Sequence, residues 1–259
     1  MTPGDRATGH GRPAHGAGAD SGGVPWAGRT LTPSPFAGDD GSADEGVAAA
    51  LADRDATGPA AVVAALAGTR VFVQVVAVAA GEEASPLTGV TSDTGADMAV
   101  VTLRAPDGRR AMPVFTSTAA LSAWDAAARP VPSEVERAAL SAADEGCALL
   151  VVDPGAERPF VVPRPALEAL AQQRPWVPSW EREDVTAAVR AAAEVEPAVA
   201  SAVVERGRRA ETAVVLALAP GLDRPAFDAL LERVQTRLAA SPVVAQAVDS
   251  LEVRLTTAP

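Results

Sequence analysis

The pattern of apolar and polar positions divides the chain near Asp44 into two contrasting parts. Residues 1–43 contain ten glycines and five prolines but few large apolar residues. Such a segment cannot bury enough apolar surface to offset the entropy lost on ordering, so the pattern predicts disorder over residues 1–43. Trp26, Leu31 and Phe36 make the stretch 26–41 a candidate for an ordered arm that attaches to the rest of the chain.

From residue 44 to 173, helical and alternating patterns follow one another. The spacing of apolar residues and the positions of Gly and Pro predict helices over 47–53, 59–67, 116–129, 133–145 and 165–173. Runs rich in β-branched residues predict strands over 70–80, 98–104, 109–115, 147–152 and 160–162. Pro130 and Pro132 are expected to end the third helix. These elements predict a mixed-sheet domain with helices over residues 44–173.

A Pro-rich segment, residues 174–184, is predicted to link this domain to a second one over residues 185–258. In the second domain the pattern predicts a helix over 185–194, strands over 199–205 and 212–219, a helix over 226–240 and an edge strand over 251–255. The segment 199–205 also fits a helix. The fold class expected for the whole chain is α/β (α+β), with a small αββαβ unit at the carboxy-terminal end.

The amino-acid composition excludes many kinds of enzyme reaction. The chain has no Lys, Asn, Ile or Tyr, its histidines are His10 and His15, and Cys147 is its single cysteine. Without Lys there is no P-loop lysine or Schiff base, and residues 16–259 cannot form a Ser-His-Asp or Cys-His pair. One cysteine cannot form a Cys-rich zinc site. We therefore expect no enzyme activity, no cofactor and no metal.

Charge and hydropathy restrict partners and location. The formal net charge is −11, which argues against nucleic acid because neutralising phosphates requires clustered positive charge. The longest apolar run, residues 71–80, is about half of the roughly 20 residues that span a membrane. The amino-terminal segment lacks the apolar region of a signal peptide. A cytoplasmic protein that contacts neither membrane nor nucleic acid is expected, with an unidentified protein partner or small-molecule ligand.

Four residues are candidates for function. Asp153 follows a buried strand, where α/β sheets place ligand-binding groups, although its Asp-Pro-Gly sequence is also explained as a turn. Trp176 and Trp180 lie in the predicted linker and either bind a partner or attach the linker to the first domain. Cys147 either acts as a nucleophile or is a small buried residue. The acidic run from Asp39 to Glu45 is explained by helix capping without a metal.

Several segments together resemble the SseB family, named for enhanced serine sensitivity, in the form found in high-GC Gram-positive bacteria. Residues 28–41 resemble the stretch that precedes the family's N-terminal domain. The segment 112–124, with its Val-Phe-Thr-Ser sequence, and the segment 149–155, with its Asp-Pro-Gly turn, resemble motifs of that domain. Many members have Asn where this chain has Asp153. Residues 218–223 and 248–252 are similar to the family's C-terminal domain.

The resemblance implies a mixed α/β N-terminal domain followed by an α+β C-terminal domain, and it provides no catalytic residues. We therefore expect a non-catalytic cytoplasmic protein with an interaction or regulatory role. The first alternative is a module that binds or senses an amino acid or related metabolite, with Asp153 as the ligand-binding residue. A thiol enzyme that depends on Cys147 is the remaining alternative.

Overall fold

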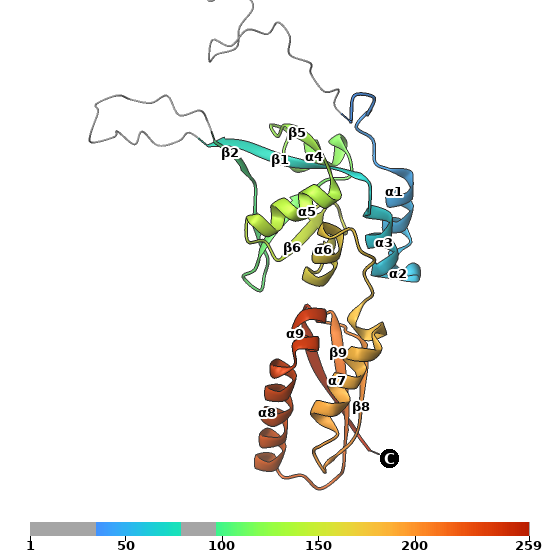
Figure 1. The fold of residues 1–259 in the computed structure, drawn as a ribbon, viewed down its shortest axis with the longest axis vertical. Helices are drawn as coiled ribbons and strands as arrows, with labels where there is room; N and C mark the ends of the chain where they lie inside the picture. Colours follow the sequence, from blue (N-terminus) through green and yellow to red (C-terminus); the bar gives the residue numbers. More distant parts are fainter. Residues whose placement is uncertain (1–34, 79–96, 259) are drawn as a thin grey trace, which may run out of the picture. The chain divides into compact units, whose positions relative to one another are not determined.

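The computed structural model describes residues 35–78 and 97–258 of the chain (Figure 1). Residues 35–39 belong to an amino-terminal unit and form a turn, in which the Asp39 amide donates to the Phe36 carbonyl at 3.1 Å. The described residues from 40 onward belong to one compact unit. Most of the tail predicted to be disordered (1–43), with Trp26 and Leu31 of the predicted arm, lies outside the described residues.

Three short helices open the compact unit, namely α1 (Glu45–Ala52), α2 (Arg54–Thr57) and α3 (Pro59–Leu66). The carboxylate of Asp44 accepts a hydrogen bond from the Val47 amide at 3.0 Å and thereby caps α1. Pro59 is the first residue of α3, where its missing N–H costs no hydrogen bond. The helices predicted over 47–53 and 59–67 are confirmed.

Two sheets follow. In the first, the strand order is β2 (Asp97–Val100), β1 (Arg70–Val78), β5 (Pro130–Glu134). In the second, the order is β3 (Leu103–Arg104), β4 (Arg110–Val114), β6 (Leu149–Val152), β7 (Phe160–Val162). An antiparallel bridge between Phe72 and Phe115 joins the two sheets. Because β4 and β6 are parallel neighbours, their carboxyl ends lie side by side.

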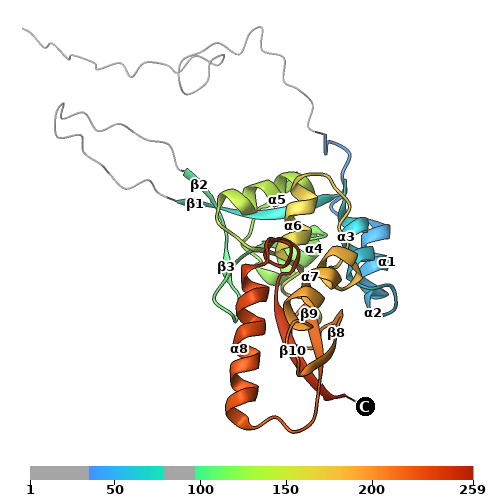
Figure 2. The same cartoon turned by 60° about the horizontal axis from the view of Figure 1, so that its bottom comes forward.

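Helices α4 (Thr118–Trp124), α5 (Val135–Asp144) and α6 (Arg164–Ala171) pack around these sheets (Figures 1 and 2). The helix predicted over 116–129 is therefore too long, and the break predicted at Pro130 and Pro132 is instead strand β5. The Asp125 carboxylate accepts hydrogen bonds from Gln74 Nε2 at 2.7 Å and from the Ala127 amide, which turns the chain out of the helix. β5 tolerates two prolines because it is an edge strand.

The carboxy-terminal half begins with the 3₁₀ helix η1 (Ser179–Glu181) and helix α7 (Glu183–Ala193). A sheet of order β10 (Leu251–Thr257), β9 (Thr212–Leu218), β8 (Val199–Arg206) is accompanied by the long helix α8 (Arg224–Ala240) and by α9 (Pro242–Ala247). Figures 1 and 2 both show α8 running beside this sheet. The edge strand β10 pairs in parallel with β9. The segment 199–205 is a strand, and α9 is an additional helix that the sequence pattern did not predict.

Each half has its own buried apolar cluster. The largest cluster in the amino-terminal half runs in sequence from Val47 to Leu170, and Trp176 packs against it. The cluster in the carboxy-terminal half runs from Val185 to Val248. The fold is thus of the mixed α/β class that the sequence predicts. Within the described chain, no helix combines the length and the apolar character needed to cross a membrane.

Candidate functional site

A cavity of about 580 Å³ opens in the amino-terminal half where α3, the start of α5 and the end of α6 meet. Volumes of this order are usual for sites that hold small organic molecules. Its wall is more apolar than polar, and it includes Val63 and Ala64 of α3, Leu170 of α6 and Trp176. We call it the Glu136 cavity, and its lining residues are Val63, Ala64, Ala67, Gly68, Glu134, Glu136, Leu170, Gln173, Arg174, Pro175 and Trp176.

Glu136 is the buried acid of this cavity, with 9% of its surface exposed. It lies in the first turn of α5, where the helix dipole favours negative charge. Its Oε1 accepts a hydrogen bond of 2.6 Å from the amide of Gly68, the glycine beyond the end of α3. Gly68 has a φ of +73°, a conformation that a side chain would strain. The contact therefore fixes the carboxyl against the end of α3.

The second oxygen of Glu136 is available. Oε2 accepts no hydrogen bond from the described residues, whereas Oε1 is engaged by Gly68. Among those residues the fully buried side-chain atoms that lack a partner are Gln74 Oε1 and Trp176 Nε1. Glu136 Oε2 is not among them, so this oxygen is not fully buried, and the residue that carries it lines the cavity. A ligand that carries an N–H or O–H donor could therefore bind this oxygen.

The other charged groups of the cavity lie closer to solvent. Glu134 pairs with Arg137 at 3.2 Å, and both side chains are exposed. Arg174 is exposed and makes no ion pair with a described residue. Exposed charges interact weakly because water and salt screen them. The strongest recognition group in the wall is therefore the buried carboxyl of Glu136.

Trp176 and Trp180, both predicted as partner-binding residues, line a second cavity of about 370 Å³ between the two halves of the compact unit. Trp176 lines both cavities, and it packs against the amino-terminal apolar cluster. Trp176 therefore attaches the linker to the first half, which is one of the two alternatives given for it. Their role in binding a partner stays a prediction.

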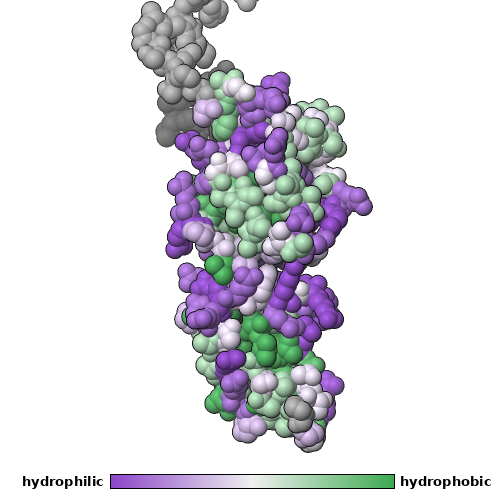
Figure 3. Space-filling model, turned by 90° about the vertical axis from the view of Figure 1, so that its right-hand side faces the viewer, coloured by the Kyte–Doolittle hydropathy of each residue, from purple (hydrophilic) through white to green (hydrophobic). Residues whose placement is uncertain are grey.

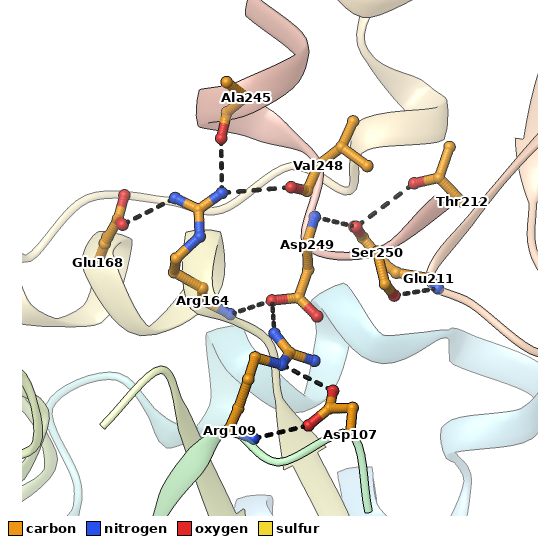
Figure 4. A network of polar contacts seen from close by, with 10 residues as sticks. All are labelled: Asp107, Arg109, Arg164, Glu168, Glu211, Thr212, Ala245, Val248, Asp249 and Ser250. Carbon is orange, nitrogen blue, oxygen red and sulfur yellow. Dashed lines mark hydrogen bonds and ion pairs between the residues drawn. The ribbon is translucent and has the colours of Figure 1, made fainter. Parts of the chain in front are cut away.

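A polar network joins the two halves beside this second cavity (Figure 4). The carboxylate of Asp249, which precedes β10, accepts hydrogen bonds from Arg109 Nη1 at 2.7 Å and from the Arg164 amide at 3.0 Å. The Arg164 guanidinium donates to the carbonyls of Ala245 and Val248 at the end of α9. Hairpin β3–β4 and the start of α6 are therefore bound to the chain that links α9 to β10.

Glu211 lies in the same network. Its Oε2 accepts a hydrogen bond from the Asp249 amide at 2.8 Å, and its Oε1 accepts one from Ser179 Oγ at 3.1 Å. Burial raises the pKa of the Glu211 carboxyl above its ordinary value, and these hydrogen bonds oppose the rise. Ser179 also contacts Thr212 through the two hydroxyl groups. Residues of the predicted linker are thus built into the carboxy-terminal half.

Asp153 does not line the Glu136 cavity or the cavity between the halves. It follows β6 with a φ of +49°, and both of its carboxylate oxygens accept hydrogen bonds from Thr116. Its predicted role in ligand binding stays untested. Cys147 is 6% exposed, and burial raises the pKa of its thiol, with Glu145 adding to the rise and Arg110 opposing it. Low reactivity is expected for such a thiol.

The acidic run has local structural roles where it is described. Asp44 caps α1, and the carboxylate of Asp40 accepts hydrogen bonds from the amide and hydroxyl of Ser42. Across residues 35–78 and 97–258, no group of three or more acids, His or Cys is placed to hold a metal ion.

Sequence reasoning missed Glu136 and its cavity. The available signal was local, because in α5 the residues Val135, Ala138 and Ala139 predict a buried face and Glu136 lies next to the first of them. The contact with Gly68 could not be predicted, since it joins residues 68 positions apart.

Of the comparisons with known proteins, the one with protein-family models gives a match. No curated protein and no solved structure matches the chain. The matched segment contains α1 to α6 almost completely, including the acid of the Glu136 cavity, whereas Arg174 and Trp176 lie beyond it. Residues 44–169 match the family model of the SseB protein N-terminal domain.

Proposed function

We propose that this protein is a non-catalytic, regulatory binding protein whose ligand is a small organic molecule held in the Glu136 cavity. The observation that carries the proposal is the cavity itself, which combines a mostly apolar wall with Glu136, an acidic residue that is about nine-tenths buried. Few polar groups in a mostly apolar cavity are typical of sites that bind small molecules and orient them. This assigns the sensing function to a different place from Asp153.

The chemistry of the side chains supports binding rather than catalysis. The chain has two histidines, both in the first 15 residues, and no lysine or tyrosine. Cys147 is buried with a raised pKa, which disfavours the reactive thiolate. The carboxylate of Asp153 is engaged by Thr116 on both oxygens. Burial of Cys147 and the contacts of Asp153 thus support a structural role for both residues.

A thermal-shift screen of amines, amino acids, organic acids and nucleotides tests this proposal with three proteins. A ligand at about 100 times its Kd adds roughly 2.7 kcal/mol to the free energy of unfolding, which raises Tm by several degrees. We expect a compound that stabilises the wild type but not Ala64→Trp, because Ala64 is exposed in the cavity wall. Ala49→Trp, on the exposed face of α1, is the matched control and should respond like the wild type.

Equal stabilisation of all three proteins would place the ligand outside the cavity. A screen that stabilises none of them would remove the support for a small-molecule function.

A role in protein interaction is the second candidate, and exposed apolar side chains of the carboxy-terminal half favour it. Val195, Val203 and Leu255 are 62%, 48% and 46% exposed. Figure 3 shows strongly hydrophobic side chains among hydrophilic neighbours on the face of the molecule that it displays. Partner capture that Val203→Glu abolishes would support this role. Leu140→Glu changes a similarly exposed apolar residue of the amino-terminal half, which lines neither cavity, and is the control.

The family relationship is proposed to extend beyond the matched segment. We propose that residues 185–258 are the SseB C-terminal domain, in the form found in high-GC Gram-positive bacteria, and that the protein acts in the cytoplasm. The order α7-β8-β9-α8-α9-β10 and the similar segments 218–223 and 248–252 support the first part. A solved structure of a family C-terminal domain with a different strand order would contradict it.

A further inference from the structure

We propose that the Glu136 cavity binds an organic ammonium ion with an apolar body, and that Glu136 is the counter-ion for its positive charge. The inference rests on the proposed function and adds the chemical class of the ligand. Three properties of the cavity lead to it: a free carboxylate oxygen, the balance of charge in the wall, and the apolar surface around that oxygen.

The first property is the position of the carboxyl group. Oε1 is held by the Gly68 amide at 2.6 Å, which fixes the position of this oxygen. Oε2 is accessible and accepts nothing from the described residues. No arginine among those residues lies within ion-pair distance of Glu136. Five other acids of the amino-terminal half do pair with an arginine, namely Asp55, Asp107, Glu134, Glu145 and Glu168.

A buried carboxylate without a cation is costly unless something compensates its charge. The first turn of α5 and the Gly68 amide provide part of the compensation. An ammonium group at Oε2 would provide the rest through a charge-assisted hydrogen bond. The geometry therefore favours a positively charged donor.

The second property is the balance of charge. Two acids, Glu134 and Glu136, and one base, Arg174, line the cavity. Arg174 is exposed, so solvent screens its attraction for an anion, whereas Glu136 is nine-tenths buried. The field inside the cavity is therefore set by a negative charge, and the net charge of the chain, −11, acts in the same direction.

The third property is the apolar wall. Val63, Leu170 and Trp176 surround the volume of about 580 Å³, which is larger than a single ammonium group needs. A hydrocarbon body that fills this space gains roughly 0.8 kcal/mol for each buried methylene group. The indole of Trp176 adds a face that attracts cations. An amine with an alkyl or aryl body matches the cavity in both charge and polarity.

The test compares three probes of one length, hexylamine, hexanol and hexanoate, by titration calorimetry at neutral pH. The proteins are the full chain, Glu136→Gln and Glu157→Gln. Gln at position 136 keeps an oxygen for the Gly68 amide, so the fold is retained while the charge is removed. Glu157 is exposed, does not line the cavity and is the control for loss of one negative charge.

We expect hexylamine to bind the wild type at least about tenfold more tightly than hexanol, and hexanoate to bind most weakly. Glu136→Gln should lose about tenfold in affinity for hexylamine and keep its affinity for hexanol, while Glu157→Gln should behave like the wild type.

Two results would overturn the inference. If hexanol or hexanoate binds as tightly as hexylamine, the cavity binds small molecules without selecting amines, and only the proposed function survives. If hexylamine at millimolar concentration does not bind the wild type, the inference fails while hits of another class in the thermal-shift screen would still support the proposed function. The comparison of the three probes on the wild type stands even if Glu136→Gln does not fold.

Discussion

Asp153 binds Thr116 through both oxygens of its carboxylate. Its Oδ1 accepts a hydrogen bond from the Thr116 amide at 2.9 Å, and its Oδ2 accepts one from the Thr116 hydroxyl at 2.8 Å. The two residues follow β6 and β4, which are parallel neighbours, so their carboxyl ends meet. The two motifs of the amino-terminal half, Val-Phe-Thr-Ser and Asp-Pro-Gly, are therefore one structural unit.

This unit predicts different effects for two substitutions of Asp153. Asp153→Ala leaves the amide and hydroxyl of Thr116, which is 7% exposed, without acceptors and puts Ala at a φ of +49°. We expect a loss of about 3 kcal/mol in the free energy of unfolding. Asp153→Asn keeps one acceptor and tolerates this φ, so it should lose about 1 kcal/mol. Urea denaturation measures the free energy of unfolding of both variants. Equal losses would contradict the view that the contacts with Thr116 and the φ of Asp153 determine the cost.

The contact between Arg109 and Asp249 makes a second prediction. Asp249 is buried, with 6% of its side chain exposed, and Asp249→Ala removes the acceptor for Arg109 and for the Arg164 amide. We expect a loss of about 2 kcal/mol in the free energy of unfolding. Asp107→Ala is the matched control, because Asp107 pairs with the same arginine but is 51% exposed. It should cost less than about 0.5 kcal/mol. A similar cost for both would show that the network contributes little.

Much of the fold followed from local patterns in the sequence. The strand Phe160–Val162 has the predicted bounds, and helix α8 is close to its predicted range because its apolar residues repeat with helical spacing. The errors arise where pairing between distant segments decides. Pro130 and Pro132 predict a break, but β5 lies at the edge of its sheet and pairs with β1, where the missing N–H groups face no partner strand.

The candidate site was harder to predict for the same reason. Trp176 was singled out as an apolar residue in a polar segment, and it does line the Glu136 cavity. The sequence does not single out Glu136, because an acid in the first turn of a helix is ordinarily explained by the helix dipole. The cavity depends on how α3, α5 and α6 approach one another, and no local pattern contains that information.

The burial of Cys147 predicts low reactivity with thiol reagents. The residue is 6% exposed in the apolar cluster of the amino-terminal half, and burial raises the pKa of its thiol. Native protein should react with a disulfide reagent at least about 100-fold more slowly than protein in denaturant, because reaction needs an opening of the structure. Stoichiometric labelling of the native protein within minutes would contradict this and restore the thiol-enzyme alternative.

The contacts of Ser179 predict where the carboxy-terminal half begins. Ser179 is fully buried and bonds to Glu211 and Thr212, although it precedes the predicted boundary at residue 185. A fragment of residues 174–259 should therefore be more stable than one of residues 185–259, by about 1 to 2 kcal/mol. Circular dichroism during urea denaturation compares the two. Equal stability would place the boundary at 185, and two unfolded fragments would show that the halves depend on each other.

The pair of arginines beside Glu196 predicts how stability changes in acid. Hydrogen bonds from Arg233, and then Arg237, lower the pKa of Glu196 from its ordinary 4.5 to about 2. The unfolded chain binds a proton at this residue near pH 4.5, and the folded chain does so only near pH 2. The contribution of Glu196 to stability is therefore complete above pH 4.5 and is lost as the pH falls from there toward 2.

Glu196→Gln should flatten the dependence of Tm on pH between pH 4.5 and 2. Glu181→Gln, which changes an exposed acid, should leave that dependence unchanged. A wild-type slope retained in Glu196→Gln would show that other carboxyl groups carry the acid dependence.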